Sequence, residues 1–206
     1  MKLFCYNTDD YGCYWYRLLT PFSKIKEKCI NNSFDFSFKI DSVEQIKDFD
    51  IVVLQRATDG LGVDFLIEAK KHNIPVIYEV DDSLFNIADT NPAYKHYTRK
   101  DVRYAINYTV NNSDYMTVST PYLSEYYKKE VGKQEIVILP NSIPLSKEYD
   151  RTNLVQKKSG KFRILLTGGI SHTGDWSFMA NTFRDLVHNS KGEIEIMIFG
   201  FVPKAL

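Results

Sequence analysis

The sequence lacks an excess of charge of either sign. Lys plus Arg and Asp plus Glu both number 26 in 206 residues, so the formal net charge is zero. A chain of this kind carries no global basic field to steer nucleic acid or an anionic membrane toward it, although a local basic patch would still be compatible with the composition. We therefore expect no nucleic acid among its partners.

Cysteine is scarce, and long apolar runs are missing. Cys5, Cys13 and Cys29 form no pair with metal-ligand spacing, and an odd number of cysteines argues against a disulfide framework. No apolar run approaches the roughly 18–20 residues that a membrane-spanning helix needs. The first residues, MKLFCYNTDDYG, turn acidic too early for a signal peptide. These absences favour a cytoplasmic protein without a membrane span.

The sequence does contain a regular alternation of short apolar runs and helical patterns. The apolar runs predict strands, which are expected at 2–6, 34–40, 50–55, 76–80, 115–119, 136–139, 162–167 and 193–200. Amphipathic helices are expected in the intervals that begin near residues 15, 61, 102, 121 and 176. Pro21 lies inside the first helical pattern and should kink or restart it. Such alternation is typical of an α/β fold, a parallel sheet covered by helices on both faces.

The pattern further predicts how the chain is divided. Residues 1–143 are expected to form one doubly wound, Rossmann-like domain, and residues 144–160 read as a charged linker without periodicity. Residues 161–206 then open a second Rossmann-like domain with one β-α-β unit. These 46 residues are near the size at which a core alone is insufficient. We expect this part to pack on the first domain, to pair with a second copy or a partner chain, or to be the start of something longer.

In doubly wound sheets, ligands bind outside the carboxyl ends of the strands, so the residues that follow each strand are the candidates for function. Gly12 follows the first strand, where it would let a ligand approach the backbone next to a helix N-terminus that can bind an anion. A plain strand-to-helix turn explains the same residues. The loop does not match the Gly-x-Gly-x-x-Gly fingerprint, so a Rossmann dehydrogenase gains no support.

In the stretch VIYEVDDSLF, an apolar run is followed by three closely spaced carboxylates, Glu79, Asp81 and Asp82. At the carboxyl edge of a sheet, one carboxylate can orient a hydroxyl or act as a base while another caps the next turn. The alternative is that both aspartates are only cap and turn residues. Arg56, after the preceding strand, could pair with a phosphate or with these carboxylates. A structural ion pair is an equally good explanation of Arg56.

A second candidate follows the strand at 162–167, where the chain reads GGISHTGD. The pair Gly168–Gly169, followed by a polar turn that opens a helix, has the physical features of a phosphate cradle. His172 can contact a phosphate or a sugar hydroxyl. Asp175 is placed to cap the helix that continues through Trp176.

Two other acidic pockets fit less well. Receiver domains carry an acidic pair that Asp9-Asp10 could imitate, but they need a phosphorylatable Asp where this chain has Gln55. Single-domain, metal-dependent glycosyltransferases use an Asp-x-Asp pattern, which Glu79-Val80-Asp81 loosely imitates. A linker and a second glycine turn are not expected in that class.

Taken together, five segments resemble a known family. They are YWYRLLTP (14–21), EVDDSLF (79–85), DYMTVSTPYLSEYY (114–127), IVILPNSI (136–143) and FRILLTGGISHTGDW (162–176). In this order they are similar to glycosyltransferases of the GT-B fold, above all to the nucleotide-sugar-dependent retaining group. The resemblance extends over nearly the whole chain, and it is the order of the segments rather than any one of them that is specific.

The resemblance implies an acceptor-binding first domain, a donor-binding second domain and transfer of a sugar from a nucleotide diphosphate to a carbohydrate or other hydroxyl acceptor. By that analogy Asp81 and Asp82 are the catalytic or acceptor-side residues. The donor-binding residues would be Gly168, Gly169, His172, Asp175, Gly12 and Arg17. Arg56, Ser119, Thr120 and Asn141 would line the cleft. Neither a cofactor nor a metal is expected, because positive groups and helix N-termini can neutralise the leaving diphosphate.

The chain departs from the family in one respect. The family's donor domain continues through a paired-Glu segment that holds the ribose and the sugar, whereas this sequence stops at Leu206 before any such segment. We expect a fragment of a longer protein, completion by another chain, or loss of catalysis. The alternative to an enzyme is a non-catalytic module that binds carbohydrate or protein and derives from the front half of such a fold.

Overall fold

A computed structural model describes residues 1–8, 12–30, 33–142 and 160–201. The chain forms two compact units. Unit 1 consists of Met1–Phe85 and Thr98–Pro144, and unit 2 consists of Asn86–Tyr97 and Leu145–Leu206. Most of the expected linker, 144–160, lies outside the described residues.

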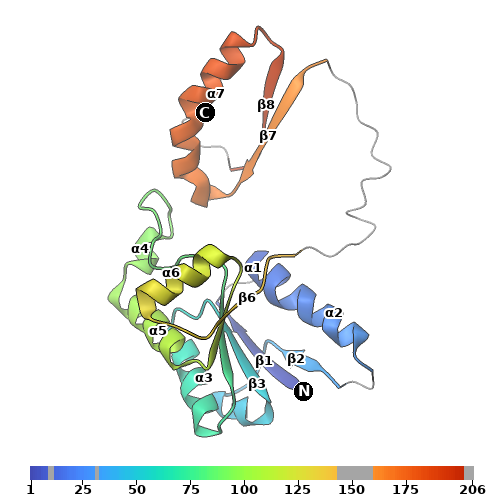
Figure 1. Cartoon of the computed structure of the whole chain (residues 1–206), viewed down its shortest axis with the longest axis vertical. Helices are drawn as coiled ribbons and strands as arrows, with labels where there is room; N and C mark the ends of the chain where they lie inside the picture. The colour runs from blue at the N-terminus through green and yellow to red at the C-terminus, as the bar shows by residue number, and fades with distance from the viewer. Residues whose placement is uncertain (9–11, 31–32, 143–159, 202–206) are drawn as a thin grey trace. The chain divides into compact units, whose positions relative to one another are not determined.

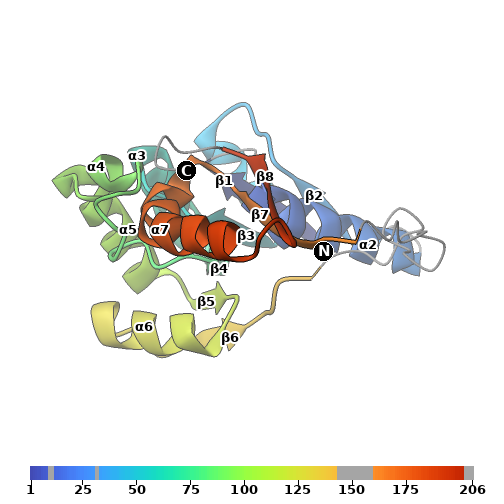
Figure 2. The same cartoon turned by 90° about the horizontal axis from the view of Figure 1, so that it is seen from above.

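Unit 1 contains a six-stranded sheet in the order β2-β1-β3-β4-β5-β6, with every neighbouring pair parallel (Figures 1 and 2). Its strands are β1 (Lys2–Asn7), β2 (Asp35–Ser37), β3 (Ile51–Gln55), β4 (Val76–Val80), β5 (Tyr115–Val118) and β6 (Ile136–Ile138). The α/β class and the parallel sheet predicted from the alternating pattern are thus confirmed for this unit, in agreement with a Rossmann-like fold.

Helices connect the strands of unit 1. They are α1 (Gly12–Tyr14), the π-helical turn η1 (Trp15–Leu19), α2 (Thr20–Lys28), the 3₁₀ helix η3 (Val43–Asp48), α3 (Gly60–Lys71), α5 (Lys100–Asn112) and α6 (Pro121–Val131). The caps agree with the sequence. Asp59 accepts a hydrogen bond from the backbone N–H of Gly62 at the start of α3, and Thr120 accepts one from Leu123 at the start of α6.

The two faces of the sheet carry alternate residues of each strand and are covered by different helices. On one face, Leu3, Cys5 and Val53 form a core cluster with Leu18 of the η1 turn, and Phe22 of α2 packs against it. On the other face, the Phe4 ring meets Phe65 of α3 edge-on, with ring centroids 4.8 Å apart. The sheet is therefore doubly wound, with α2 and α3 on opposite sides (Figure 1).

The expected strand at 34–40 is shorter in the structure. Only Asp35–Ser37 pair with β1, at the edge of the sheet. The Ser37 hydroxyl accepts a hydrogen bond from the Lys39 N–H and donates one to the Lys39 carbonyl, which closes a local turn and ends the strand. The alternation of phenylalanines in this segment reflects packing against α2 rather than a long ladder.

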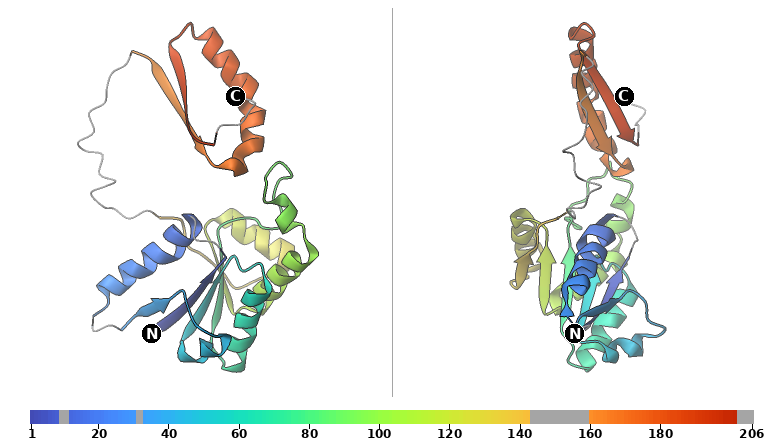
Figure 3. Two further views of the ribbon diagram at one scale, coloured as in Figure 1. Left: turned by 180° about the vertical axis from the view of Figure 1, so that it is seen from behind. Right: turned by 90° about the vertical axis from the view of Figure 1, so that its right-hand side faces the viewer.

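Unit 2 contains a parallel pair of strands, β7 (Phe162–Gly168) and β8 (Ile194–Gly200), joined by η5 (Ile170–His172) and α7 (Thr173–Asn189). It also contains the short helix α4 (Tyr94–Tyr97). Figure 3 shows α7 along one side of the two-stranded ribbon. On the other side, Leu165, Met197 and Phe199 are exposed.

Candidate functional site

The helix after β1 changes its winding just before Pro21. Residues Trp15–Leu19 form a π-helical turn, and α2 continues from Thr20. Proline lacks an N–H and its ring crowds the carbonyl four residues earlier, so the wider π turn accommodates it without ending the helix. The expected disturbance at Pro21 is therefore present. Its effect is to present Tyr16 and Arg17 toward the carboxyl edge of the sheet.

Arg17 is buried and bonded on several sides. Its Nε donates to Glu79 Oε1 at 2.7 Å, and its Nη1 donates to Asn141 Oδ1 at 3.1 Å and to the Leu139 carbonyl. The second Glu79 oxygen accepts from Gln55 Nε2 at 2.8 Å. Four segments that are distant in sequence thus meet at one ion pair.

This arrangement distinguishes Glu79, which lies within β4, from Asp81 and Asp82, which follow the strand. Glu79 is 3% exposed, and its side chain points to the face of the sheet that α2 covers rather than past the edge. Burial raises the pKa of the Glu79 carboxyl, against the opposing effect of the Arg17 guanidinium. Arg17 is the ion-pair partner of Glu79, with Nε and Oε1 2.7 Å apart. Glu79 fixes the first helix to the sheet, which leaves Asp81 and Asp82 as the edge residues.

Asp81 directly follows β4 at the carboxyl edge of the sheet. The Tyr16 hydroxyl donates to Asp81 Oδ2 at 3.0 Å. Burial, with the neighbouring Cys13 and Asp81, raises the pKa of Tyr16, so the phenol keeps its proton and remains a donor. Asp81 Oδ1 is enclosed by protein and has no hydrogen-bond partner among the described residues.

Cys13 and Arg56 complete this cluster. Cys13 Sγ lies 3.5 Å from the Tyr16 hydroxyl and accepts from Arg56 Nη1 at 3.4 Å. Burial raises the pKa of the Cys13 thiol, so it stays protonated at neutral pH. Arg56 has a φ of 47°, a backbone conformation that non-glycine residues rarely adopt, at the carboxyl end of β3. These contacts place Cys13, Tyr16, Arg56 and Asp81 together at this edge of the sheet.

The other site residues predicted for unit 1 take part in local hydrogen bonds, in a helix cap or in packing. Asp82 Oδ1 accepts from the Ser83 N–H at 2.8 Å, and its carbonyl accepts from the Tyr127 hydroxyl. Thr120 caps α6. Ser119 is buried at the end of β5. Gly12 begins the first helical segment, where a Cβ would come within 3.3 Å of the Tyr16 ring.

In unit 2, the predicted glycine turn follows β7. A Cβ at Gly168 would lie 2.9 Å from the His172 ring, so a larger residue at this position would require the imidazole to move. A Cβ at Gly169 would meet only Ser171 Oγ, at 3.9 Å, and otherwise open space. The turn therefore leaves the backbone at Gly169 accessible to a ligand.

The expectation that Asp175 caps the following helix was wrong. The helix begins at Thr173 with His172 at the N-cap position, because the 3₁₀ turn η5 runs directly into it. Asp175 lies in the first helical turn, and its Oδ2 is 2.9 Å from His172 Nδ1. His172 and Asp175 are thus brought together, and both side chains are largely exposed.

Trp176 is a further polar group at this turn that the sequence pattern assigned only to the helix core. The indole is 5% exposed, and its Nε1 has no partner among the described residues. Its Cζ2 atom, two bonds from Nε1, would lie 3.3 Å from a Cβ at Gly168. An enclosed N–H donor therefore lies close to the end of β7, beside the N-terminus of α7.

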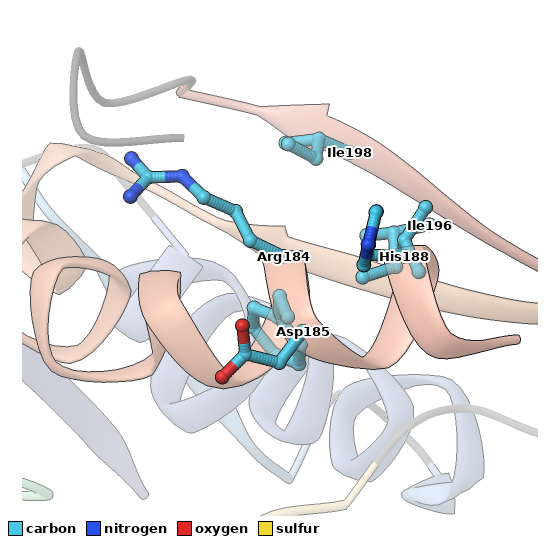
Figure 4. A pocket seen from close by; sticks show the side chains of 7 residues that line it. Arg184, Asp185, His188, Ile196 and Ile198 are labelled. Carbon is cyan, nitrogen blue, oxygen red and sulfur yellow. The ribbon is translucent and has the colours of Figure 1, made fainter.

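Unit 2 also contains a cavity of about 640 Å³ between α7 and β8. Figure 4 shows Ile196 and Ile198 of β8 beside Arg184, Asp185 and His188 of α7. None of the residues of the glycine turn lines this cavity. The cavity is therefore separate from the predicted phosphate cradle.

The described residues contain neither a cluster of metal-ligating side chains nor a helix suited to cross a membrane. Within these ranges, no group of three or more His, Cys, Asp or Glu side chains is arranged to hold a metal ion. No helix in the described part of the chain is both long and apolar enough to cross a membrane.

Comparison with models of known protein families found no match, and comparison with curated proteins found none either.

Sequence reasoning missed three members of the site: Tyr16, Cys13 and the Gln55 amide as a partner of Glu79. Tyr16 lies in an aromatic-rich helical segment, where core packing is the ordinary explanation. The available signal was Pro21, because a disturbed helix next to a sheet edge often marks a functional position.

Proposed function

We propose that the chain takes part in transferring a sugar from a nucleotide-diphosphate donor to a hydroxyl acceptor. In this proposal unit 1 supplies groups for the acceptor and unit 2 supplies groups for the donor. The order of the five sequence segments and the parallel sheet of unit 1 support this proposal.

The observation that carries the proposal is the state of Asp81. The residue lies at the carboxyl edge of a parallel sheet, where ligands of doubly wound folds bind. Tyr16 satisfies one carboxylate oxygen and leaves the other without a donor among the described residues. An enclosed acceptor without a donor is costly. In this proposal the side chains around Oδ1 move aside when the acceptor molecule binds, and a hydroxyl of that molecule then satisfies the oxygen. Asp81 would then orient that hydroxyl and receive its proton.

On the donor side, the turn from Gly168 to Asp175 combines two features that suit a diphosphate. The backbone is open at Gly169, and the 17-residue helix α7 begins at Thr173, so the positive end of its dipole lies at the same turn. His172 can add a further hydrogen bond. The Asp175 carboxylate opposes an anion here, and its contact with His172 reduces that opposition.

The test is a thermal-shift screen of the whole chain with UDP-, GDP-, ADP- and dTDP-sugars. A donor that binds only the folded state adds about 2.7 kcal/mol of stability at a hundred times its dissociation constant. Gly169→Val should abolish the shift without lowering the melting temperature of the free protein, since its side chain enters open space. The matched control is Phe178→Val, which alters an 89% exposed side chain on α7, the helix that follows the glycine turn.

The variant Asp81→Asn distinguishes donor binding from the transfer reaction. It should leave the donor-induced shift intact and abolish release of nucleotide diphosphate in the presence of acceptor sugars. If no nucleotide-sugar raises the melting temperature, the transferase proposal is rejected and a non-catalytic carbohydrate- or protein-binding module becomes the better explanation.

A further inference from the structure

Unit 1 also contains a cavity on the face of its sheet that α2 covers. This cavity of about 370 Å³ lies between α2 and the sheet, behind the buried Arg17–Glu79 pair. Its floor is formed by Leu3, Val53, Ile77 and Thr117 from four neighbouring strands, β1, β3, β4 and β5.

The other walls are also mainly apolar. Leu18, Pro21, Phe22 and Ile25 of the first helix cover the cavity, and Leu139 and Pro140 form a rim. Leu139 and Ile25 are 49% and 42% exposed, so the apolar lining continues from the buried floor to the surface. A pocket of this size lies within the range of small-molecule sites, which are mostly apolar with a few polar groups.

The polar atoms of the cavity restrict the charge of its ligand. Arg17 and Glu79 neutralise each other, and Gln55 and Asn141 provide further hydrogen bonds to the pair. The pair therefore presents no net charge, and a charged ligand group would lose its hydration without an opposite charge to replace it. The hydroxyl-bearing residues Tyr16, Thr117 and Ser142 also line the cavity and suit a neutral alcohol or ether oxygen.

The volume restricts the size of the ligand. At about 30 Å³ per heavy atom, the share that a water molecule occupies in the liquid, the cavity holds roughly a dozen atoms. A folded partner protein would need roughly 800 Å² of contact on its side, much more than such a pocket offers. A free sugar would bury many hydroxyl groups against apolar walls without partners.

We propose that this cavity binds a neutral, mainly aliphatic group of about ten heavy atoms with one polar end. The polar end lies toward Tyr16 and Thr117, and the aliphatic part lies between Phe22, Ile25 and the sheet. This inference does not require sugar transfer, because it concerns the face of the sheet beneath α2 and makes no use of unit 2. Tyr16, whose hydroxyl donates to Asp81, is the residue that the two proposals share.

The test uses 1-octanol as the probe and the whole chain with ¹³C-labelled isoleucine methyl groups. Saturable shifts are expected at Ile25 and Ile77, which line this cavity, and no shifts at Ile196 and Ile198, which line the cavity of unit 2. Octanoate and 1,8-octanediol serve as comparisons of equal chain length. Both should bind at least tenfold more weakly, because one carries a charge and the other has polar groups at both ends.

A matched pair of variants locates the binding. Ile25→Trp fills the mouth of the cavity and should weaken octanol binding at least tenfold. Ile67→Trp makes the same change at a similarly exposed position, 39%, on α3, and should leave binding unchanged. The buried Ile46 and Ile106 methyl groups, if unshifted between variants, show that the fold is retained.

Three results would overturn the proposal: shifts confined to Ile196 and Ile198, octanoate binding as tightly as octanol, or Ile25→Trp binding as well as the parent. Each result places the ligand elsewhere or assigns it a different chemistry.

Discussion

Replacing Arg17 by methionine should sharply destabilise unit 1. Methionine is similar in length to arginine and can fill the same space. It lacks the guanidinium N–H groups that donate to Glu79 Oε1, Asn141 Oδ1 and the Leu139 carbonyl. The Glu79 side chain is then left buried, with the Gln55 amide as its remaining hydrogen-bond donor among the described residues. A buried carboxylate without its cation either pays the cost of desolvation or takes up a proton.

The expected loss is about 3–5 kcal/mol, the cost of removing one partner of a buried ion pair. This is a large part of the roughly 5–15 kcal/mol by which domains are stable. With a urea m-value of about 2 kcal/mol/M, the unfolding midpoint should fall by roughly 2 M. Trp15 fluorescence in a Trp176→Phe background reports the transition of unit 1 alone, because these are the two tryptophans of the chain.

Two comparisons sharpen the test. Arg99→Met removes the arginine of the Arg99–Asp101 pair, whose side chains are 59% and 65% exposed, and should leave the midpoint unchanged. The double variant Arg17→Met with Glu79→Leu removes both charges and should recover at least half of the loss. If Arg17→Met costs less than about 1 kcal/mol, or if the double variant is no more stable than the single one, the ion pair does not hold the helix to the sheet as argued.

Three further outcomes are expected. The Cys5 thiol is fully buried and burial raises its pKa to about 12, so its alkylation at pH 8 should occur only at the rate of unfolding, as mass spectrometry of labelled peptides can show. Gly62→Ala should lower the free energy of unfolding by about 1–3 kcal/mol, because its Cβ would lie 2.6 Å from the Cβ of Ala57. In the same urea assay, Gly60→Ala should leave the free energy of unfolding unchanged or raise it by up to about 1 kcal/mol, because its Cβ meets nothing within 4 Å. Thr120→Ala should cost about 1 kcal/mol through loss of the α6 cap, and Thr120→Ser should restore most of it; equal midpoints for both variants would contradict the cap's role.

Much of the fold follows from local patterns in the sequence. The apolar runs at 50–55 and 76–80 are strands in the structure, because continuous β-branched and aliphatic residues suit a sheet that is buried on both faces. Thr120 and Pro121 mark the start of α6 within one residue, because capping and the fixed φ of proline act over only a few positions. Asp81 at the carboxyl edge follows from the same reasoning, since a strand that ends at Val80 leaves the next residue there.

Tertiary structure alone decided how the candidate site is assembled. Arg17 and Glu79 are 62 residues apart in sequence. The sequence suggested that Glu79 was one of three carboxylates at the sheet edge, whereas in the structure its side chain lies on the face that α2 covers. The π turn before Pro21 aligns Tyr16 with Asp81, and the early start of α7 sets Asp175 beside His172. Periodicity and capping are properties of neighbouring residues. The burial of a charge, its counter-ion and the cavity beside it depend on how distant segments pack, which no local pattern encodes.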